Sequence, residues 1–246
     1  MKDEKLAVLI DADNVPYANV KEMLEEIAKN GVPTIKRIYA DWTRPTVSGW
    51  KNVLLENAIT PIQQYSYTTG KNSSDSALII DAMDILYSDK VDGFCIVSSD
   101  SDFTRLATRL REAGKTVIGF GEKKTPQPFI SACNKFIYIE ILKKEKVEEI
   151  NTKTAAKPKA KKEPLNKLDP GTIKLIVESV NDLADENGWT FLANLGNHIL
   201  KRKPDFDSRN YGFPKLLPLI KSIHKLEIDE RSTGPGNIKH IYIKQK

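Results

Sequence analysis

Residues 92–120, DGFCIVSSDSDFTRLATRLREAGKTVIGF, hold a helical pattern between two apolar runs. The runs at 92–99 and 115–120 are apolar without strict alternation, which is typical of strands buried on both faces. Residues 103–112 between them have the amphipathic spacing of a helix packed on one side. A strand, a helix and a second strand in this order predict two parallel strands joined by a crossover helix.

The same alternation extends over the first 142 residues. The remaining apolar runs predict strands at residues 6–11, 33–40, 59–65 and 135–141, and the amphipathic runs predict helices at 20–29, 48–57 and 74–87. Strands that alternate with helices form a parallel sheet covered by helices on both faces. We therefore expect residues 1–142 to form an α/β domain, a three-layer sandwich around a mostly parallel sheet.

The rest of the chain predicts a tether and a second, smaller domain. Residues 143–165 are rich in lysine and nearly lack large apolar residues, so we expect a flexible linker. Residues 166–246 begin with Asp169-Pro170, a helix N-cap followed by proline at the first helical position. Helices are predicted from 170 to about 185, at 191–200 and at 213–223, and a hairpin at 225–230 and 238–244. This order is typical of a winged helix-turn-helix domain.

Composition and charge restrict the chemistry. Of the 246 residues 40% are hydrophobic and 29% charged, and no apolar run approaches the roughly 20 residues of a membrane span. The N-terminus lacks the features of a signal peptide, so we expect a cytoplasmic protein. Cys95 and Cys133 lie in apolar segments without metal-site spacing, which predicts buried thiols. All three histidines lie beyond residue 163, so chemistry in the first domain must use carboxylates, hydroxyls or lysine.

Acidic residues follow two of the predicted strands. Asp11 ends the first strand, with Asp13 two residues later, and Asp100 and Asp102 follow the strand at 92–99. In an open parallel sheet, ligands bind beyond the carboxyl ends of the strands, where the strand order reverses. Helix capping explains about one carboxylate at each end, and the others repel one another unless a cation neutralises them.

A third acidic contribution is predicted from the helix at 74–87. Asp75 lies on the same stripe as Leu78, Ala82 and Leu86, so we expect it to point inward beside Asp11 and Asp100, with helix capping as its alternative role. Asp81 and Asp84 fall on another face and are expected to be solvated.

Carboxylates without histidine or cysteine favour Mg²⁺ or Mn²⁺, which can activate a water against a phosphodiester. Lys71 is a candidate contact for the phosphate, with an exposed loop lysine as the alternative. Asn14 and Ser99 are candidates to position water or ligands, with local turn bonding as the alternative for both.

The blocks LIDADN (9–14), KNSSDSALIID (71–81) and IVSSDSDFTRLATRLREAGKTVIGFG (96–121) together resemble the NYN domain of the LabA-like group in the PIN-like nuclease superfamily. The resemblance covers residues 5 to 142. It implies a metal-dependent nuclease in which four aspartates bind the metal, with Asn14 and Lys71 in supporting positions. These four are Asp11, Asp75, Asp100 and Asp102.

The segment from Thr172 to Ser222 resembles the LOTUS, or OST-HTH, domain, with its glycine-tryptophan turn and its block FDSRNYGFPKL. The resemblance covers about residues 166 to 246 and implies binding of RNA, including G-rich RNA, and in some relatives docking of a protein partner. Candidate RNA contacts are a basic run and a nearby cation with an aromatic ring, namely Lys201, Arg202, Lys203, Arg209 and Tyr211. The alternatives are a solvated surface for the basic run and a place in the core for Tyr211. In the first domain, Trp42 and Arg44 are further candidates, with packing of the ring as the alternative.

Two other functions fit the same residues. Residues 11–15, DADNV, also fit the nucleophile motif of haloacid-dehalogenase-type phosphatases, in which Asp11 would become phosphorylated. A non-catalytic RNA-binding adaptor, whose cleft merely holds a cation or mediates a homodimer, is the second. The inward face of Asp75 and the RNA-binding-like module favour the ribonuclease.

Overall fold

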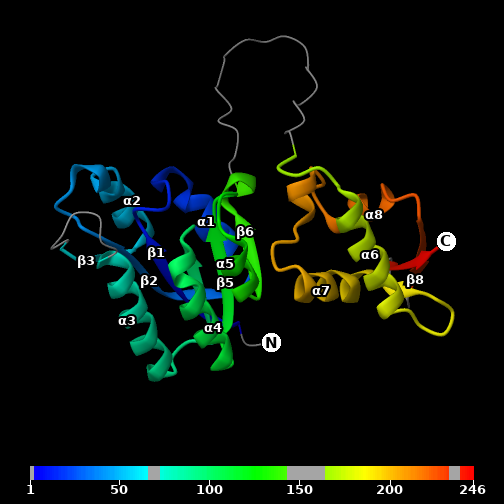
Figure 1. Cartoon of the computed structure of the whole chain (residues 1–246), viewed down its shortest axis with the longest axis horizontal. Coiled ribbons are helices and arrows are strands. Elements are labelled where there is room, and N and C mark those ends of the chain that lie inside the picture. The colour runs from blue at the N-terminus through cyan, green and yellow to red at the C-terminus, as the bar shows by residue number, and fades with distance from the viewer. Residues whose placement is uncertain (1–2, 66–72, 143–163, 233–238) are drawn as a thin grey trace, which may run out of the picture. The chain divides into compact units, whose positions relative to one another are not determined.

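The computed structural model describes residues 3–65, 73–142, 164–232 and 239–246, and the chain divides into two compact units, Met1–Lys144 and Glu145–Lys246 (Figure 1). Each unit has its own sheet. The tether predicted at 143–165 lies almost wholly outside the described residues. None of the helices in the described ranges has the length and apolar character of a membrane span.

The first unit is built on a six-stranded sheet in which every neighbouring pair is parallel. The strand order is β3-β2-β1-β4-β5-β6. The chain therefore adds β2 and β3 on one side of β1, and then crosses back to add β4, β5 and β6 on the other side. All six strands were predicted. Their bounds are Lys5–Asp11 (β1), Val32–Ala40 (β2), Thr60–Gln63 (β3), Gly93–Val97 (β4), Thr116–Gly121 (β5) and Lys135–Tyr138 (β6).

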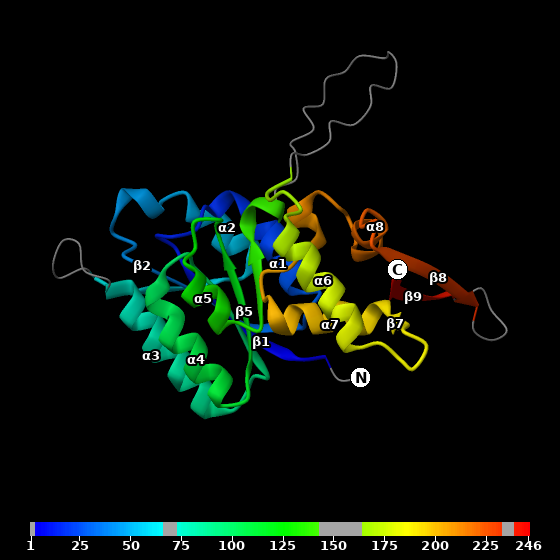
Figure 2. The same cartoon turned by 45° about the vertical axis from the view of Figure 1, so that its right-hand side comes forward.

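Helices cover both faces of this sheet, as Figures 1 and 2 show, which confirms the predicted three-layer arrangement. On one face, α1 (Val20–Ile27) and α2 (Trp50–Asn57) pack on alternate strand residues such as Val8, Ile10 and Val97. On the other face lie α3 (Ser73–Ser88), α4 (Thr104–Glu112) and α5 (Gln127–Ala132). The six-residue α5 was not predicted, because it is too short to show a helical period. Short 3₁₀ helices occupy Tyr17–Asn19 (η1), Pro45–Val47 (η2), Ser101–Phe103 (η3) and Ile139–Leu142 (η4).

Helix α3 buries the predicted stripe, but one of its acids behaves differently from the prediction. Asp84 is exposed, as expected. Asp81, expected to be solvated, instead accepts hydrogen bonds from the guanidinium of Arg37 and the hydroxyl of Tyr39 on β2. The prediction for Asp81 was wrong because a one-helix pattern does not show that two polar side chains of the neighbouring strand reach the same carboxylate. Cys95 and Cys133 are buried free thiols, as predicted.

In residues 164–232 and 239–246, the second unit holds three α-helices and a three-stranded antiparallel sheet. The helices are α6 (Pro170–Asp182), α7 (Leu192–Arg202) and α8 (Leu216–Lys221), and the 3₁₀ helix η5 (Ser208–Tyr211) precedes α8. The Asp169 carboxylate accepts a hydrogen bond from the Thr172 amide at 2.9 Å, which confirms the predicted N-cap.

The predicted hairpin consists of β8 (Leu226–Ser232) and β9 (Lys239–Gln245). A third strand that was not predicted, β7 (Thr190–Phe191), pairs with β9, so the order is β7-β9-β8. Two residues are too few to show a strand pattern. The core beneath the sheet includes Ile176, Leu195, Ile199 and Ile243.

Candidate acidic metal centre

The candidate site lies at the carboxyl ends of β1 and β4, which are neighbours in the sheet although distant in the chain. Asp11 is the last residue of β1, and Asp100 and Asp102 follow β4 at the start of η3. The strand order reverses between these two strands, which is where ligands bind in open parallel sheets.

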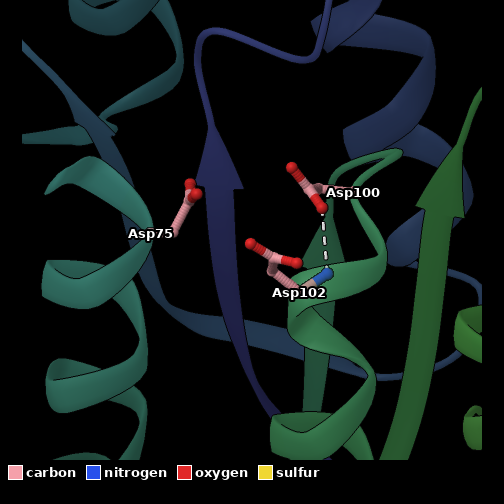
Figure 3. Close-up of side chains that lie close together, drawn as sticks. All are labelled: Asp75, Asp100 and Asp102. Atoms are coloured by element: carbon pink, nitrogen blue, oxygen red, sulfur yellow. Dashed lines mark hydrogen bonds between the residues drawn. The ribbon is translucent and has the colours of Figure 1, made fainter. Parts of the chain in front are cut away.

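Three carboxylates meet at this edge. One oxygen each from Asp75, Asp100 and Asp102 lies within 4.8 Å of the others. Figure 3 shows Asp75 on α3 facing the loop that carries Asp100 and Asp102, with the end of β1 between them. Asp75 is only 7% exposed, Asp100 is half-buried and Asp102 is exposed, so the group is open to solvent on one side.

Local turn bonding holds the loop after β4 in place. The Asp102 amide donates to an Asp100 carboxylate oxygen at 2.9 Å, so Asp100 caps η3 (Figure 3). The Asp100 amide in turn donates to the hydroxyl of Ser98 at 3.1 Å. These bonds fix the backbone and leave the second oxygen of Asp100 outside the cap.

Asp11 is held by a network of its own. Its carboxylate accepts hydrogen bonds from the Asn14 side chain at 2.7 Å, the Ser98 hydroxyl at 2.8 Å and the Asp13 amide at 3.2 Å. Burial raises the pKa of Asp11, and the bonds from Asn14 and Ser98 oppose that rise. The Asp11 carboxyl group is therefore held in one orientation by hydrogen bonds. It lies at the end of β1 and is not one of the three clustered carboxylates, Asp75, Asp100 and Asp102.

Burial and the neighbouring acids together raise the pKa of Asp75 to about 7. Burial is the largest cause, followed by the charges of Asp11, Asp100 and Asp102. Near neutral pH the site thus carries more negative charge than its surroundings stabilise. A bound cation would remove that penalty.

The donor set fits a hard divalent cation. All the clustered donors are carboxylate oxygens, which Mg²⁺ and Mn²⁺ prefer, and the three histidines of the chain lie in the other unit. Asp75, Asp100 and Asp102 are the residues that could hold such an ion.

The three residues predicted to support the site, Asn14, Ser99 and Lys71, differ in where they lie. Asn14 lies in the site and donates to Asp11. Ser99 is buried, and its hydroxyl oxygen accepts the Glu122 amide at 2.9 Å, which ties the loop to the end of β5; its role in positioning water or ligands stays a prediction. Lys71 lies outside the described residues. Ser98 was missed, since two adjacent serines after a strand do not reveal which one turns toward Asp11.

Trp42 and Arg44 line an open pocket formed by the segment after β2, by α2 and by β3. Trp42 is half-buried, and its indole N–H donates to the Ile62 carbonyl at 2.9 Å. Arg44 pairs with Asp41 at 3.5 Å. The pocket has a volume of about 920 Å³ and is also lined by Lys51 and Leu54 of α2. The ring of Trp42 is therefore partly used in packing.

The predicted RNA contacts of the second unit are mostly engaged within it. Arg202 pairs with Glu178 at 2.8 Å and Asp182 at 3.2 Å, and Lys203 pairs with Asp205 at 3.2 Å. The remaining predicted contacts differ in their exposure.

Arg209 pairs with Asp207 at 2.6 Å, and Lys201 is exposed. Tyr211 is 7% exposed within the core, with its hydroxyl 3.4 Å from that of Thr172. The predicted stacking of RNA on Tyr211 is therefore corrected, because a ring that is 7% exposed within the core offers little surface to a base.

The fold and site define a class of protein: a parallel α/β domain with an acidic ligand site at its switch point, followed by a small winged-helix module. Residues 5–140 match the family model of the NYN domain, and residues 163–238 match that of the OST-HTH/LOTUS domain. The chain belongs to the NYN domain family. An NYN domain, of the PIN-like nuclease class, followed by an RNA-binding LOTUS domain suggests a nuclease that acts on RNA.

Solved structures include similar chains. A protein of unknown function from Vibrio parahaemolyticus is 23% identical over 56% of this chain and 93% of its own, with a TM-score of 0.46. An uncharacterized protein from Nitrosomonas europaea is 30% identical over 38% of this chain and 89% of its own, with a TM-score of 0.32. No curated protein matches the chain.

Proposed function

We propose that the protein is a Mg²⁺- or Mn²⁺-dependent ribonuclease that hydrolyses phosphodiester bonds at the carboxyl ends of β1 and β4. The observation that carries the proposal is the approach of Asp75 to Asp100 and Asp102, within 4.8 Å between ligand oxygens. These residues come from two segments about 25 residues apart, and burial together with the charges of Asp11, Asp100 and Asp102 raises the pKa of Asp75; a bound cation would offset the repulsion among them.

Each acidic residue has its own role in the proposal. Asp75, Asp100 and Asp102 would hold the ion, and Asp11 would complete the acidic floor. When bound, such an ion supplies an activated water and stabilises charge on the phosphate oxygens. Ser98 and Asn14 fix the orientation of the Asp11 carboxylate through bonds of 2.8 and 2.7 Å. A metal site whose carboxylates are already oriented needs less rearrangement on binding.

The second unit would deliver RNA to this site. A tethered binding module raises the local concentration of substrate at the catalytic unit. Residues 164–246 carry 13 Lys and Arg against 10 Asp and Glu, so the module has a net charge of +3 that favours a polyanion. In the first unit, Trp42 and Arg44 at the pocket beside β3 are the proposed contacts for the RNA strand. A cytoplasmic location, a homodimer and a protein partner of the LOTUS domain remain predictions.

End-labelled RNA and DNA incubated with the full chain and Mn²⁺ or EDTA test the proposal. We expect Mn²⁺-dependent cleavage of RNA that Asp100→Asn abolishes. The matched control is Asp84→Asn, because Asp84 is an exposed acid of α3 outside the cluster. Two results together would favour the non-catalytic adaptor: the wild-type chain cuts no RNA with any divalent ion, and its affinity for RNA is the same with and without metal.

The phosphatase alternative has a separate signature. A phosphorylated Asp11 detected by mass spectrometry, with turnover of small phosphate esters and no effect on RNA, would replace the ribonuclease proposal. The position of Asp75 argues against the phosphatase. In that mechanism Asp11 is the nucleophile, and a second, inward-facing acid on α3 has no role.

A further inference from the structure

The sheet of the second unit has two faces of different character. Strand register places Ile228 of β8 opposite Ile243 of β9, and Thr190 of β7 opposite Ile243 as well. Ile243 is fully buried, and α6 and α7 both contact β9, so this face covers the core. The residues one position along each strand point to the opposite side of the sheet.

That opposite side carries aromatic and cationic side chains, together with two acids of β8, Glu227 and Asp229, which lie opposite Lys244 and Tyr242. Register pairs Phe191 with Tyr242, and His240 with Arg231. Trp189 and Lys244 lie two residues from Phe191 and Tyr242, on the same side of their strands. We call this set the wing face. Its members are Trp189, Phe191, Arg231, His240, Tyr242 and Lys244, and each is partly exposed.

These side chains form one continuous row. The Phe191 ring centroid lies 5.2 Å from that of His240 and 5.7 Å from that of Tyr242. The Arg231 guanidinium lies 4.2 Å from the Tyr242 centroid and 5.1 Å from that of Trp189. The Lys244 ammonium follows at 5.8 Å from Trp189. The row therefore begins with three neighbouring rings and continues with a guanidinium, a fourth ring and an ammonium group.

A solvent-facing sheet surface normally carries polar side chains, so a row of partly exposed rings favours a binding role. Its chemistry matches an unpaired polynucleotide. Bases stack on aromatic rings and on guanidinium planes, while cations between them meet the phosphates. Of the residues first expected to contact RNA, Tyr211 offers no exposed ring because it is buried, whereas the rings of the wing face are partly exposed.

We propose that the wing face is the surface on which the second unit binds single-stranded RNA, with bases stacked along Phe191, Tyr242 and the Arg231 guanidinium. This inference rests on the proposed delivery of RNA by the second unit. It moves the contact surface from the basic run at 201–203 to the outer face of the β7-β9-β8 sheet. Asp229 pairs with Arg231 at 2.7 Å and holds its guanidinium at the edge of the row.

Binding of a fluorescent single-stranded RNA of about 12 nucleotides to the full chain tests the proposal, measured by anisotropy in EDTA so that nothing is cleaved. We expect Phe191→Thr and Tyr242→Thr each to weaken binding by about 10-fold, because each removes one stacking ring. Threonine suits an exposed strand position, so the sheet should survive. Phe191→Tyr keeps a ring and should bind like the wild type.

A charge variant supplies a second measurement. Arg231→Gln should weaken binding and reduce the slope of log affinity against log salt by about 0.7. The matched control is Lys221→Gln. Lys221 is an exposed cation of the same unit that pairs with Glu230, the residue before Arg231, and it does not belong to the wing face. We expect the control to bind RNA like the wild type.

The outcomes separate the two proposals. If the wild-type chain binds RNA and the threonine variants, with unchanged thermal unfolding, bind it equally well, the wing face is excluded while the ribonuclease proposal stands. If Phe191→Tyr binds as poorly as Phe191→Thr, stacking is excluded. If the wild-type chain binds no single-stranded RNA, both the wing face and delivery by the second unit are overturned, whatever the first unit cuts.

Discussion

Replacing Asp75 with Asn should stabilise the metal-free first unit near neutral pH. The asparagine side chain keeps the shape of aspartate but removes the charge, which burial disfavours most and which Asp11, Asp100 and Asp102 also repel. The rise of the Asp75 pKa from 3.8 to about 7 corresponds to an upper limit of about 4 kcal/mol of unfolding free energy. Because Asp102 is exposed and Asp100 is half-buried, solvent screens part of the repulsion, and we expect a gain of about 2 kcal/mol.

The pH dependence of this effect has a definite sign. The folded state holds the Asp75 proton up to about pH 7, whereas the unfolded chain releases it near 3.8. Between these values the folded state binds more protons, so the contribution of Asp75 to wild-type stability falls as the pH rises. Below that window both states are protonated and the penalty disappears. The advantage of Asp75→Asn should therefore be small at the acidic end and complete above about pH 7.

The two cysteines allow a measurement on this unit alone. Cys95 and Cys133 are the only cysteines of the chain, and both are buried in the first unit. Pulse labelling with a pyridyl disulfide across a urea series in EDTA thus reports its unfolding. Asp84→Asn, which removes an exposed acid of the same helix, should shift stability by less than about 0.5 kcal/mol. If the Asp75→Asn variant is no more stable than the wild type at neutral pH, the energetic penalty on the charged form of Asp75 is refuted.

Three further substitutions have expected outcomes. Ser98→Ala removes the hydroxyl 2.8 Å from the Asp11 carboxylate and should weaken Mn²⁺ affinity by about 10-fold in calorimetry; unchanged affinity would deny Ser98 its positioning role. Asp169→Ala removes the cap of α6 and should cost the second unit about 1 kcal/mol in thermal unfolding, and an unshifted transition would contradict this. Gly119→Ala places a methyl group 2.5 Å from the Phe136 ring and should cost the first unit about 2 kcal/mol by thiol labelling, whereas wild-type stability would show that the ring can move.

Much of the fold follows from periodicity because the elements of the first unit are regular. Strands buried on both faces are apolar runs, and turn-forming residues mark where each run begins and ends. All six predicted strands appear in the sheet of the first unit. The elements that escaped prediction are short, namely α5 (Gln127–Ala132) and β7 (Thr190–Phe191). Their conformation is set by neighbours, since β7 exists only through its pairing with β9.

A residue of the candidate site could be predicted where its position depends only on the element that carries it. Asp75 was placed inward by helical spacing, and it is buried in the structure. Asp81 and Ser98 were not predictable, because their roles depend on side chains that arrive from other elements, from β2 for Asp81 and from β1 for Ser98. Arg202 illustrates the same limit in the second unit, since a basic run in sequence does not reveal its acidic partners on α6.

The position of Asp75 follows from the topology of the sheet. The chain builds β1, β2 and β3 outward, and α3 then carries it from β3 back to β4 on the far side of β1. A crossover helix of this kind starts at the carboxyl edge of the sheet and packs across the strands it passes, and α3 contacts both β1 and β2. Its first turn therefore lies above the point where the strand order reverses. An inward acid in that turn faces the ends of β1 and β4 together, so the carboxylate cluster results from the reversal itself.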